Sequence, residues 1–288
     1  MRSLILGTAA FQQSYGIANG VEQRSYSEIQ ELLKFSQAHG INSFDSAPTY
    51  DPAEELLGIY LDHSLAPKVS TKIDSKACNS VSEIIASVQM SIHKLRVGFL
   101  ETLYIHDPAS VSNTQKIQIR DALIELKGMG LIENIGFSAY TIADVLQGID
   151  AVPEIKTIQV PENLADQRLL HSSELACLKT EGISFVVRSV FLQGLLLMSP
   201  NKIPTNLLVF QSFLDKLISI ATEEECTVLE LCLDYVSKIP WASHTLVGAV
   251  NSHQIEEMLH SRSVLPPDWQ EKIIPIHSSL VDPRNWNQ

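Results

Sequence analysis

Residues 68–106 read KVSTKIDSKACNSVSEIIASVQMSIHKLRVGFLETLYIH, and this stretch decides the fold. Its two ends, Lys68 to Ile73 and Thr102 to His106, are short runs rich in β-branched residues, as is typical of strands. Between them, apolar residues from about Val81 to Leu95 recur with the spacing of a helix. The stretch therefore predicts a strand, a helix and a second strand that runs parallel to the first.

The same alternation extends over the whole chain. Six further strand candidates are Ser3 to Thr8, Ile41 to Ser46, Ile132 to Ser138, Thr157 to Pro161, Ile183 to Ser189 and Thr245 to Ala249. A helix candidate begins at the capping-box pattern Ser27-Glu28-Ile29-Gln30 and stops at Gly40. The remaining helix candidates run over about Gln115 to Met129, Gln167 to Thr180, Phe210 to Glu224 and Thr227 to Ser237.

Eight strands alternating with helices, without a linker-like stretch, predict an α/β protein with one (β/α)8 TIM barrel over residues 1–288. A doubly wound sheet gives the same alternation. That sheet usually carries GxGxxG after its first strand, whereas the first strand here ends in Leu6-Gly7-Thr8-Ala9. The closed barrel is therefore the favoured fold.

Composition excludes several classes of protein. The chain has 288 residues, of which 45% are hydrophobic, and its formal net charge of −12 disfavours nucleic acid as a partner. We expect a cytoplasmic protein without a membrane partner, because no signal-peptide pattern and no membrane-spanning apolar run occurs. The spacing of the four cysteines is typical of reduced packing residues rather than of a metal site: Cys78, Cys177, Cys226 and Cys232.

Three ionisable residues stand at the ends of consecutive predicted strands. Asp45, Lys72 and His106 end the second, third and fourth strand candidates. In a (β/α)8 barrel the active site lies at the carboxyl ends of the strands, so the three side chains are expected at one mouth. Each alone has a structural explanation, as a helix cap, a solvated strand end or a buried histidine. Together they predict a catalytic site.

The chain resembles the aldo-keto reductase family at motifs spread over nearly its whole length. The loop motif Phe44-Asp45-Ser46-Ala47-Pro48-Thr49-Tyr50 is followed by Glu54-Glu55-Leu56-Leu57-Gly58. The similarity continues, in order, through Ser70-Thr71-Lys72, Tyr104-Ile105-His106-Asp107-Pro108, Ile135-Gly136-Phe137-Ser138, Arg188-Ser189-Val190-Phe191-Leu192-Gln193-Gly194-Leu195-Leu196 and Leu246-Val247-Gly248-Ala249. The opening residues Leu6-Gly7-Thr8-Ala9 and Tyr15-Gly16 also resemble bacterial members linked to sugar and polysaccharide modification.

The resemblance implies a catalytic tetrad of Asp45, Tyr50, Lys72 and His106 for carbonyl reduction or alcohol oxidation. Hydride arriving at a carbonyl carbon places negative charge on the oxygen, which must then receive a proton. Tyr50 is the expected donor, and the Lys72 ammonium is expected to lower the phenol pKa. Asp45 would pair with Lys72, while His106 would orient the substrate, a small carbonyl compound or sugar.

The resemblance also implies a nicotinamide cofactor, NADP(H) or NAD(H), and no metal. Its expected contacts are Gly7, Thr8, Ser138, Gln159, Arg188, Ser189, Phe191, Gln193, Gly194, Gly248, Ala249 and Gln254. Ala139 and Arg188 depart from the family pattern, which has an asparagine at the first and often a nicotinamide-stacking tyrosine at the second. The family places NADP(H) first, but residues 250–254 lack the cation that usually binds its 2′-phosphate, which makes NAD(H) an alternative.

Two other functions fit parts of this pattern. The barrel could bind the cofactor as a regulatory or sensor subunit without turnover, although sensing alone does not require all four tetrad residues. Alternatively, Lys72 could form a Schiff base, which requires an uncharged amine, whereas Asp45 beside it would keep the amine charged.

Overall fold

Eight parallel strands form a closed barrel in which each strand pairs with its neighbours in sequence and β8 pairs with β1. The strands are β1 Leu4–Gly7, β2 Ser43–Asp45, β3 Lys68–Ile73, β4 Leu100–Ile105, β5 Ile132–Ser138, β6 Ile155–Pro161, β7 Ser184–Arg188 and β8 His244–Gly248. The computed structural model describes residues 3–11, 16–17, 25–74, 79–108, 111–152, 154–261 and 265–286. Tyr15 and Cys78 lie outside the described residues. The predicted (β/α)8 barrel is confirmed.

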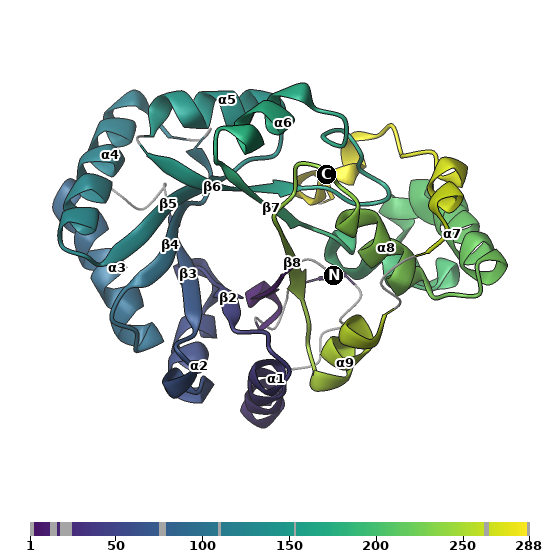
Figure 1. Ribbon diagram of the computed structural model, residues 1–288, viewed down its shortest axis with the longest axis horizontal. Helices are drawn as coiled ribbons and strands as arrows, with labels where there is room; N and C mark the ends of the chain where they lie inside the picture. The colour runs from purple at the N-terminus through teal and green to yellow at the C-terminus, as the bar shows by residue number, and fades with distance from the viewer. Residues whose placement is uncertain are drawn as a thin grey trace.

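Helices surround the strands on the outside of the barrel (Figure 1). They are α1 Tyr26–Ala38, α2 Ala53–Tyr60, α3 Val81–Leu95, α4 Asn113–Gly128, α5 Ile142–Ala151, α6 Ser173–Thr180, α7 Gln211–Glu223, α8 Val228–Ser237 and α9 Ser252–His260. Short 3₁₀ segments include η1 Ala9–Phe11, η2 Pro48–Tyr50, η5 Leu192–Leu197 and η10 Pro283–Asn285. Among the described helices, none is both long and apolar enough to cross a membrane.

Helix starts explain where the sequence prediction failed. α1 is capped by a box of Ser25 and Glu28, two residues before the predicted pattern, because the Ser25 side chain accepts from the Glu28 N–H. α5 was not predicted, although Thr141 and Asp144 form a capping box at its start. α9 was also missed, and Asn251 caps it by accepting from the Gln254 N–H. Capping residues therefore carried a usable signal at α5 and α9.

Two motif glycines are needed for close packing. A β-carbon on Gly58 of α2 would lie 2.0 Å from the carbonyl oxygen of Lys94 at the end of α3. A β-carbon on Gly136 of β5 would lie 2.5 Å from the carbonyl oxygen of Thr157 on β6. Both distances are too short for any side chain, so these positions are restricted to glycine by the backbone of a neighbouring element.

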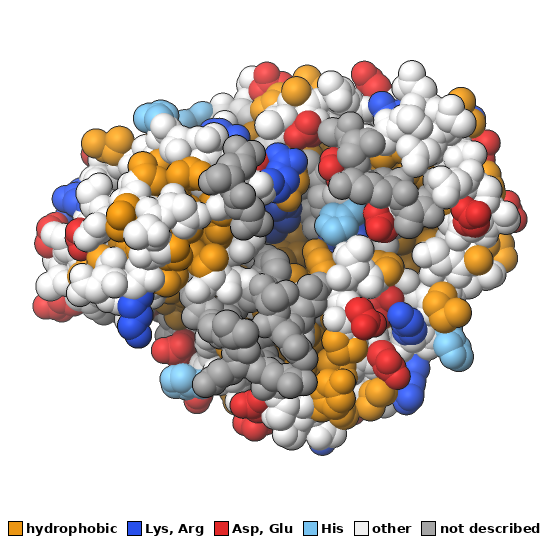
Figure 2. All heavy atoms as spheres, turned by 180° about the vertical axis from the view of Figure 1, so that it is seen from behind, with side chains coloured by type: hydrophobic (Ala, Val, Ile, Leu, Met, Phe, Trp, Pro, Cys, Tyr) orange, Lys and Arg blue, Asp and Glu red, His pale blue; other side chains and the backbone are white. Residues whose placement is uncertain are grey.

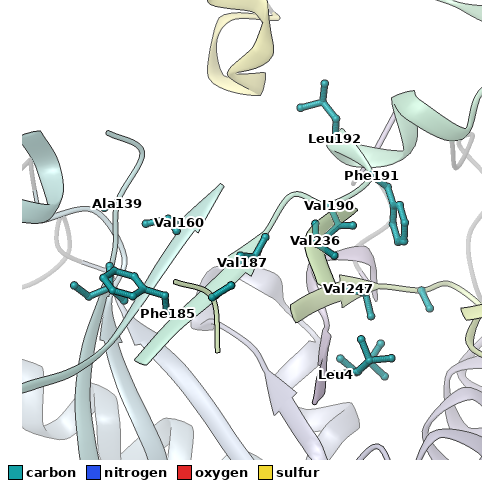
Figure 3. Packing of buried hydrophobic residues seen from close by; sticks show 14 of the residues in the cluster. Leu4, Ala139, Val160, Phe185, Val187, Val190, Phe191, Leu192, Val236 and Val247 are labelled. Atoms are coloured by element: carbon teal, nitrogen blue, oxygen red, sulfur yellow. The ribbon is translucent and has the colours of Figure 1, made fainter. Parts of the chain in front are cut away.

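The hydrophobic core joins the barrel to its helices. Figure 3 shows Val187 of β7 and Val247 of β8 in the same cluster as Val236 of α8, and all three side chains are buried. Burial of such side chains contributes about 1.5–3 kcal/mol each, which holds the strand ends in fixed positions. The residues at those ends are thus presented on a rigid support.

The C-terminal segment returns to the barrel after α9. Its backbone is tied at Ile276, whose N–H donates to the carbonyl oxygen of Ala165 at 2.9 Å, and at Trp286, whose carbonyl oxygen accepts from Asn206 at 2.7 Å. Figure 1 shows the end of the chain close to β7. This path brings Arg284 to the ring of Tyr140, in the connection between β5 and α5.

Candidate active site

The predicted strand-end residues lie where the barrel fold requires them. Asp45 is the last residue of β2, Lys72 the penultimate residue of β3, and His106 follows β4 directly. Tyr50 ends η2, the short 3₁₀ turn that leaves β2. Because all strands are parallel, these positions share the carboxyl end of the barrel.

Asp45 and Lys72 form a buried ion pair. Their side chains are 5% and 3% exposed, and a short contact joins Lys72 Nζ to Asp45 Oδ1. Lys72 Nζ also donates to the carbonyl oxygen of Ser46 at 2.8 Å. Two buried charges are stable together only when their remaining polar atoms are also bonded, and this requirement is met on both sides. The expected pairing of Asp45 with Lys72 is therefore present.

Tyr50 and His106 complete the group. Their ring centroids are 6.1 Å apart at an interplanar angle of 89°, so the two rings meet edge to face. The Lys72 ammonium lies 5.2 Å from the Tyr50 ring centroid. All four members of the predicted tetrad thus come together around one point of the rim.

Burial controls the protonation of both rings. Burial, followed by the negative charge of Asp45, raises the pKa of Tyr50, while Arg188 lowers it. The expected net lowering of the Tyr50 pKa is wrong, because desolvation of the phenolate and the negative charge of Asp45 prevail. Burial and the Lys72 charge lower the pKa of His106 to about 4. At neutral pH the site therefore holds a protonated phenol and a neutral imidazole.

Gln159 connects the tetrad to the expected nicotinamide contacts. Its Nε2 atom donates to Asp45 Oδ2 at 2.6 Å, and its Oε1 atom accepts from the Ser138 hydroxyl at 3.2 Å. Burial raises the pKa of the Tyr104 phenol, and a hydrogen bond with Gln159 acts in the opposite direction. The sequence indicated Ser138 and Gln159 as cofactor contacts but gave no signal for the bond to Asp45.

A pocket of about 530 Å³ lies beside β1, β7 and β8. Seven of the expected cofactor residues line it: Gly7, Ser189, Phe191, Gln193, Gly194, Gly248 and Gln254. Thr8 and Ala249 are buried instead, and the Thr8 hydroxyl contacts Ser46 Oγ at 2.9 Å. The lining residues that sequence reasoning missed come chiefly from the starts of η1 and α8 and from α9: Ala9, Ala10, Thr227, Val228, Leu229, Glu257 and Met258.

The loop that closes one side of this pocket has an unusual backbone. Ser189, Leu192 and Gln193 have φ values of 60°, 47° and 55°, and Gly194 has a φ of 89°. Left-handed conformations at non-glycine residues are strained and occur preferentially at ligand-binding loops. The N–H groups of Leu192 and Gly194 donate to the carbonyl oxygens of Ser189 and Phe191, so this backbone forms two successive tight turns beside the pocket.

Arg188 ends β7 and packs over Tyr140. Its Cζ atom lies 4.2 Å from the Tyr140 ring centroid, and Nη2 donates to the carbonyl oxygen of Ala139 at 3.2 Å. Arg284 approaches the same ring, with its Cζ atom 3.5 Å from the centroid. The sequence placed Arg188 among the expected cofactor contacts, at a position where many relatives have a nicotinamide-stacking tyrosine. Here its guanidinium packs against the ring of Tyr140.

Comparison with known proteins identifies the family. A profile described as the Aldo/keto reductase family matches residues 3–273. The chain belongs to the aldo-keto reductase family. It is 28% identical to D-arabinose 1-dehydrogenase of Saccharomyces cerevisiae over 150 residues, covering 48% of this chain and 43% of that protein. The match between the two chains thus spans less than half the length of that relative.

Two further similarities extend over most of the chain. This aldo-keto reductase is 24% identical to a protein named probable voltage-gated potassium channel subunit beta of Arabidopsis thaliana, covering 85% of this chain and 84% of that one. It resembles the structure of glycerol dehydrogenase AKR11B4 of Gluconobacter oxydans with a TM-score of 0.73 and 20% identity, covering 94% and 89% of the two chains. The second similarity supports the fold.

Proposed function

We propose that this aldo-keto reductase transfers a hydride between NAD(P)H and the carbonyl carbon of a small substrate, with Tyr50 as the proton donor. The observation that carries the proposal is the convergence of Tyr50, His106 and the Asp45–Lys72 ion pair at the rim of the barrel. A phenol, an imidazole and a buried ammonium at one position supply the proton, the hydrogen-bond donor and the positive charge that carbonyl reduction requires.

The pocket beside β8 fits the cofactor. Its volume of about 530 Å³ and its lining by the loop residues Ser189, Gln193 and Gly194 suit an extended dinucleotide. Ser138 and Gln159 supply a hydroxyl and an amide where a carboxamide could exchange hydrogen bonds. When bound, the reduced nicotinamide supplies the hydride. The protein orients it and keeps water from the reacting carbon.

Each tetrad residue then has a defined task. His106 is neutral at neutral pH, so one ring nitrogen carries a proton that it donates to the substrate oxygen without transferring it. Tyr50 transfers its phenolic proton to that oxygen as negative charge develops there. The Lys72 ammonium stabilises the phenolate that remains, and Asp45 keeps Lys72 charged and in place.

The protonation state of Tyr50 suits it to act as an acid at neutral pH. A phenol whose pKa is raised holds its proton through the neutral range and is ready to act as an acid. Alcohol oxidation requires the phenolate as a base, which is scarce under the same conditions. We therefore assign Tyr50 the role of general acid in the reduction of small aldehydes, ketones and sugars.

A second candidate function is cofactor sensing without turnover. The similarity to the potassium channel subunit beta supports it, since that relative covers most of the chain. The complete tetrad favours catalysis, because cofactor binding alone does not need Tyr50.

One experiment separates the two functions. Reduced cofactor and an aldehyde are mixed with the protein, and hydride transfer is followed in a single turnover by loss of nicotinamide absorbance. Replacing Tyr50 by Phe removes the proton and is expected to slow this step by about 10²- to 10⁴-fold while cofactor affinity is retained. Tight cofactor binding without any turnover in the unchanged protein would establish the sensor function instead.

A further inference from the structure

Arg188 is a half-buried cation without a carboxylate partner among the described residues. Among the described residues, no Asp or Glu oxygen lies within 4.0 Å of its guanidinium, and its hydrogen bonds go to Ser189 Oγ at 3.3 Å and to the carbonyl oxygen of Ala139 at 3.2 Å. Both acceptors are neutral. A guanidinium has five N–H donors, so donors remain for a ligand.

The neighbouring arginines provide a contrast within the same rim. Arg284, over the same Tyr140 ring, is held by both oxygens of Asp282, with contacts of 2.6 to 3.0 Å. Arg168 is held in the same way by Asp166, at 2.6 and 2.7 Å. In both pairs the aspartate stands two residues before the arginine and cancels its charge. Arg188 lacks this arrangement.

The charge of Arg188 acts on the reacting groups. It lowers the pKa of Tyr50 and also that of His106, so the guanidinium is within electrostatic range of both rings. The contact with the Tyr140 ring stabilises the cation but does not cancel its charge.

We propose that Arg188 recognises an anionic group, a carboxylate or a phosphate, on the carbonyl substrate of this enzyme. The planar guanidinium can bind two oxygens of either group at once, and Tyr140 and Ala139 hold the plane in position. On the face drawn in Figure 2, Lys or Arg side chains and a His side chain lie close together near the middle of the molecule. The inference rests on the proposed carbonyl reduction and names its substrate class.

The phosphates of the cofactor are the competing anion. Arg188 does not line the pocket of about 530 Å³ that fits the cofactor, although the next residue, Ser189, does. A role toward the cofactor therefore predicts weaker cofactor binding on loss of Arg188. A role toward the substrate predicts discrimination between charged and neutral substrates instead.

The test compares matched substrates in the unchanged protein and in Arg188→Gln. The pairs are succinic semialdehyde with butanal, for carboxylate, and glyceraldehyde 3-phosphate with glyceraldehyde, for phosphate. A lost charge-assisted bond should lower kcat/KM for the anionic member by about 10- to 100-fold relative to the neutral one, in one pair or in both. Arg284→Gln is the control, and it should leave the ratio within about threefold because Asp282 already occupies that guanidinium.

A binding measurement makes the inference independent of turnover. Calorimetric titration of the protein with oxidised cofactor compares 4-hydroxybutyrate with 1-butanol, and glycerol 3-phosphate with glycerol. Stronger binding of the anionic alcohol, lost in Arg188→Gln, supports the inference. It does so even when the protein reduces no carbonyl, because the absence of reduction would refute only the proposed function. Equal binding of anionic and neutral alcohols, or an Arg188→Gln defect confined to cofactor affinity, would overturn it.

Discussion

The side-chain amide of Gln159 donates a 2.6 Å hydrogen bond to Oδ2 of Asp45, although 114 residues separate the two positions in the chain. Asp45 therefore has one oxygen on Lys72 and the other on Gln159, and both partners are buried. Through Gln159 the ion pair that supports Tyr50 is tied to Ser138, on the side where the cofactor is proposed to bind. Cofactor binding and the position of the ion pair are thereby connected.

Replacing Gln159 by Leu should impair catalysis as well as cofactor binding. The substitution leaves Asp45 Oδ2 buried without a donor, and loss of a hydrogen bond to a charged group costs about 1.5–3 kcal/mol, or about 10- to 100-fold in kcat. Single-turnover hydride transfer at saturating cofactor measures this effect. Ser138→Ala is the control, because it removes a contact of Gln159 but leaves the bond to Asp45, so its effect should be confined to cofactor affinity. Equal kcat values for the two variants would show that the bond to Asp45 has no catalytic role.

The strand-end residues were predictable because their positions follow from local sequence. Asp45, Lys72 and His106 each end a recognisable β-branched run, and the parallel barrel places such ends together. Tyr50 was predictable only from the family motif, since a tyrosine in a loop is usually a packing residue.

The contacts of Tyr140 lay beyond sequence reasoning for a physical reason. Arg284 reaches that ring from the C-terminal segment, and the path of this segment depends on tertiary contacts such as the one between Ile276 and Ala165. The predicted direction of the Tyr50 pKa shift was wrong for a similar reason. It results from competition between burial and several charges, and burial is known only when the packing is known.

The Asp45–Lys72 ion pair can be tested by comparing a single with a double substitution. Lys72→Met leaves a buried carboxylate unpaired and should reduce the free energy of unfolding by about 3–5 kcal/mol. Adding Asp45→Asn removes the stranded charge and should restore most of that stability. Urea unfolding measures both variants. Activity should remain lost in each, because Tyr50 lacks the ammonium that stabilises its phenolate; recovery of activity in the double variant would remove Lys72 from the mechanism.

The raised pKa of Tyr50 predicts a constant rate of reduction and a rising rate of oxidation as the pH increases. Reduction uses the protonated phenol, so its single-turnover rate should stay constant from about pH 6 to about pH 9. Oxidation uses the phenolate, so its rate should rise about tenfold for each pH unit over that range. His106, with a pKa of about 4, remains neutral throughout and should add no inflection. An oxidation rate that levels off near neutral pH would mean that the bound complex lowers the phenol pKa.

The choice between the two nicotinamide cofactors should depend on Glu257. Its carboxylate is the one charged side chain among the described residues that line the pocket of about 530 Å³, and it faces the same space as Gln254 and Met258. A carboxylate repels the 2′-phosphate of NADPH and can accept a hydrogen bond from the 2′-hydroxyl of NADH. We therefore expect the pocket to favour NADH, although family resemblance alone placed NADP(H) first. Fluorescence titration should show tighter binding of NADH, and Glu257→Gln should reduce the preference by about 10- to 100-fold.

Glu256→Gln is the control, because it changes a neighbouring carboxylate that does not line the pocket. It should leave the preference for NADH unaltered. Tighter binding of NADPH to the unchanged protein would contradict this prediction. It would mean that a cation outside the pocket lining binds the 2′-phosphate.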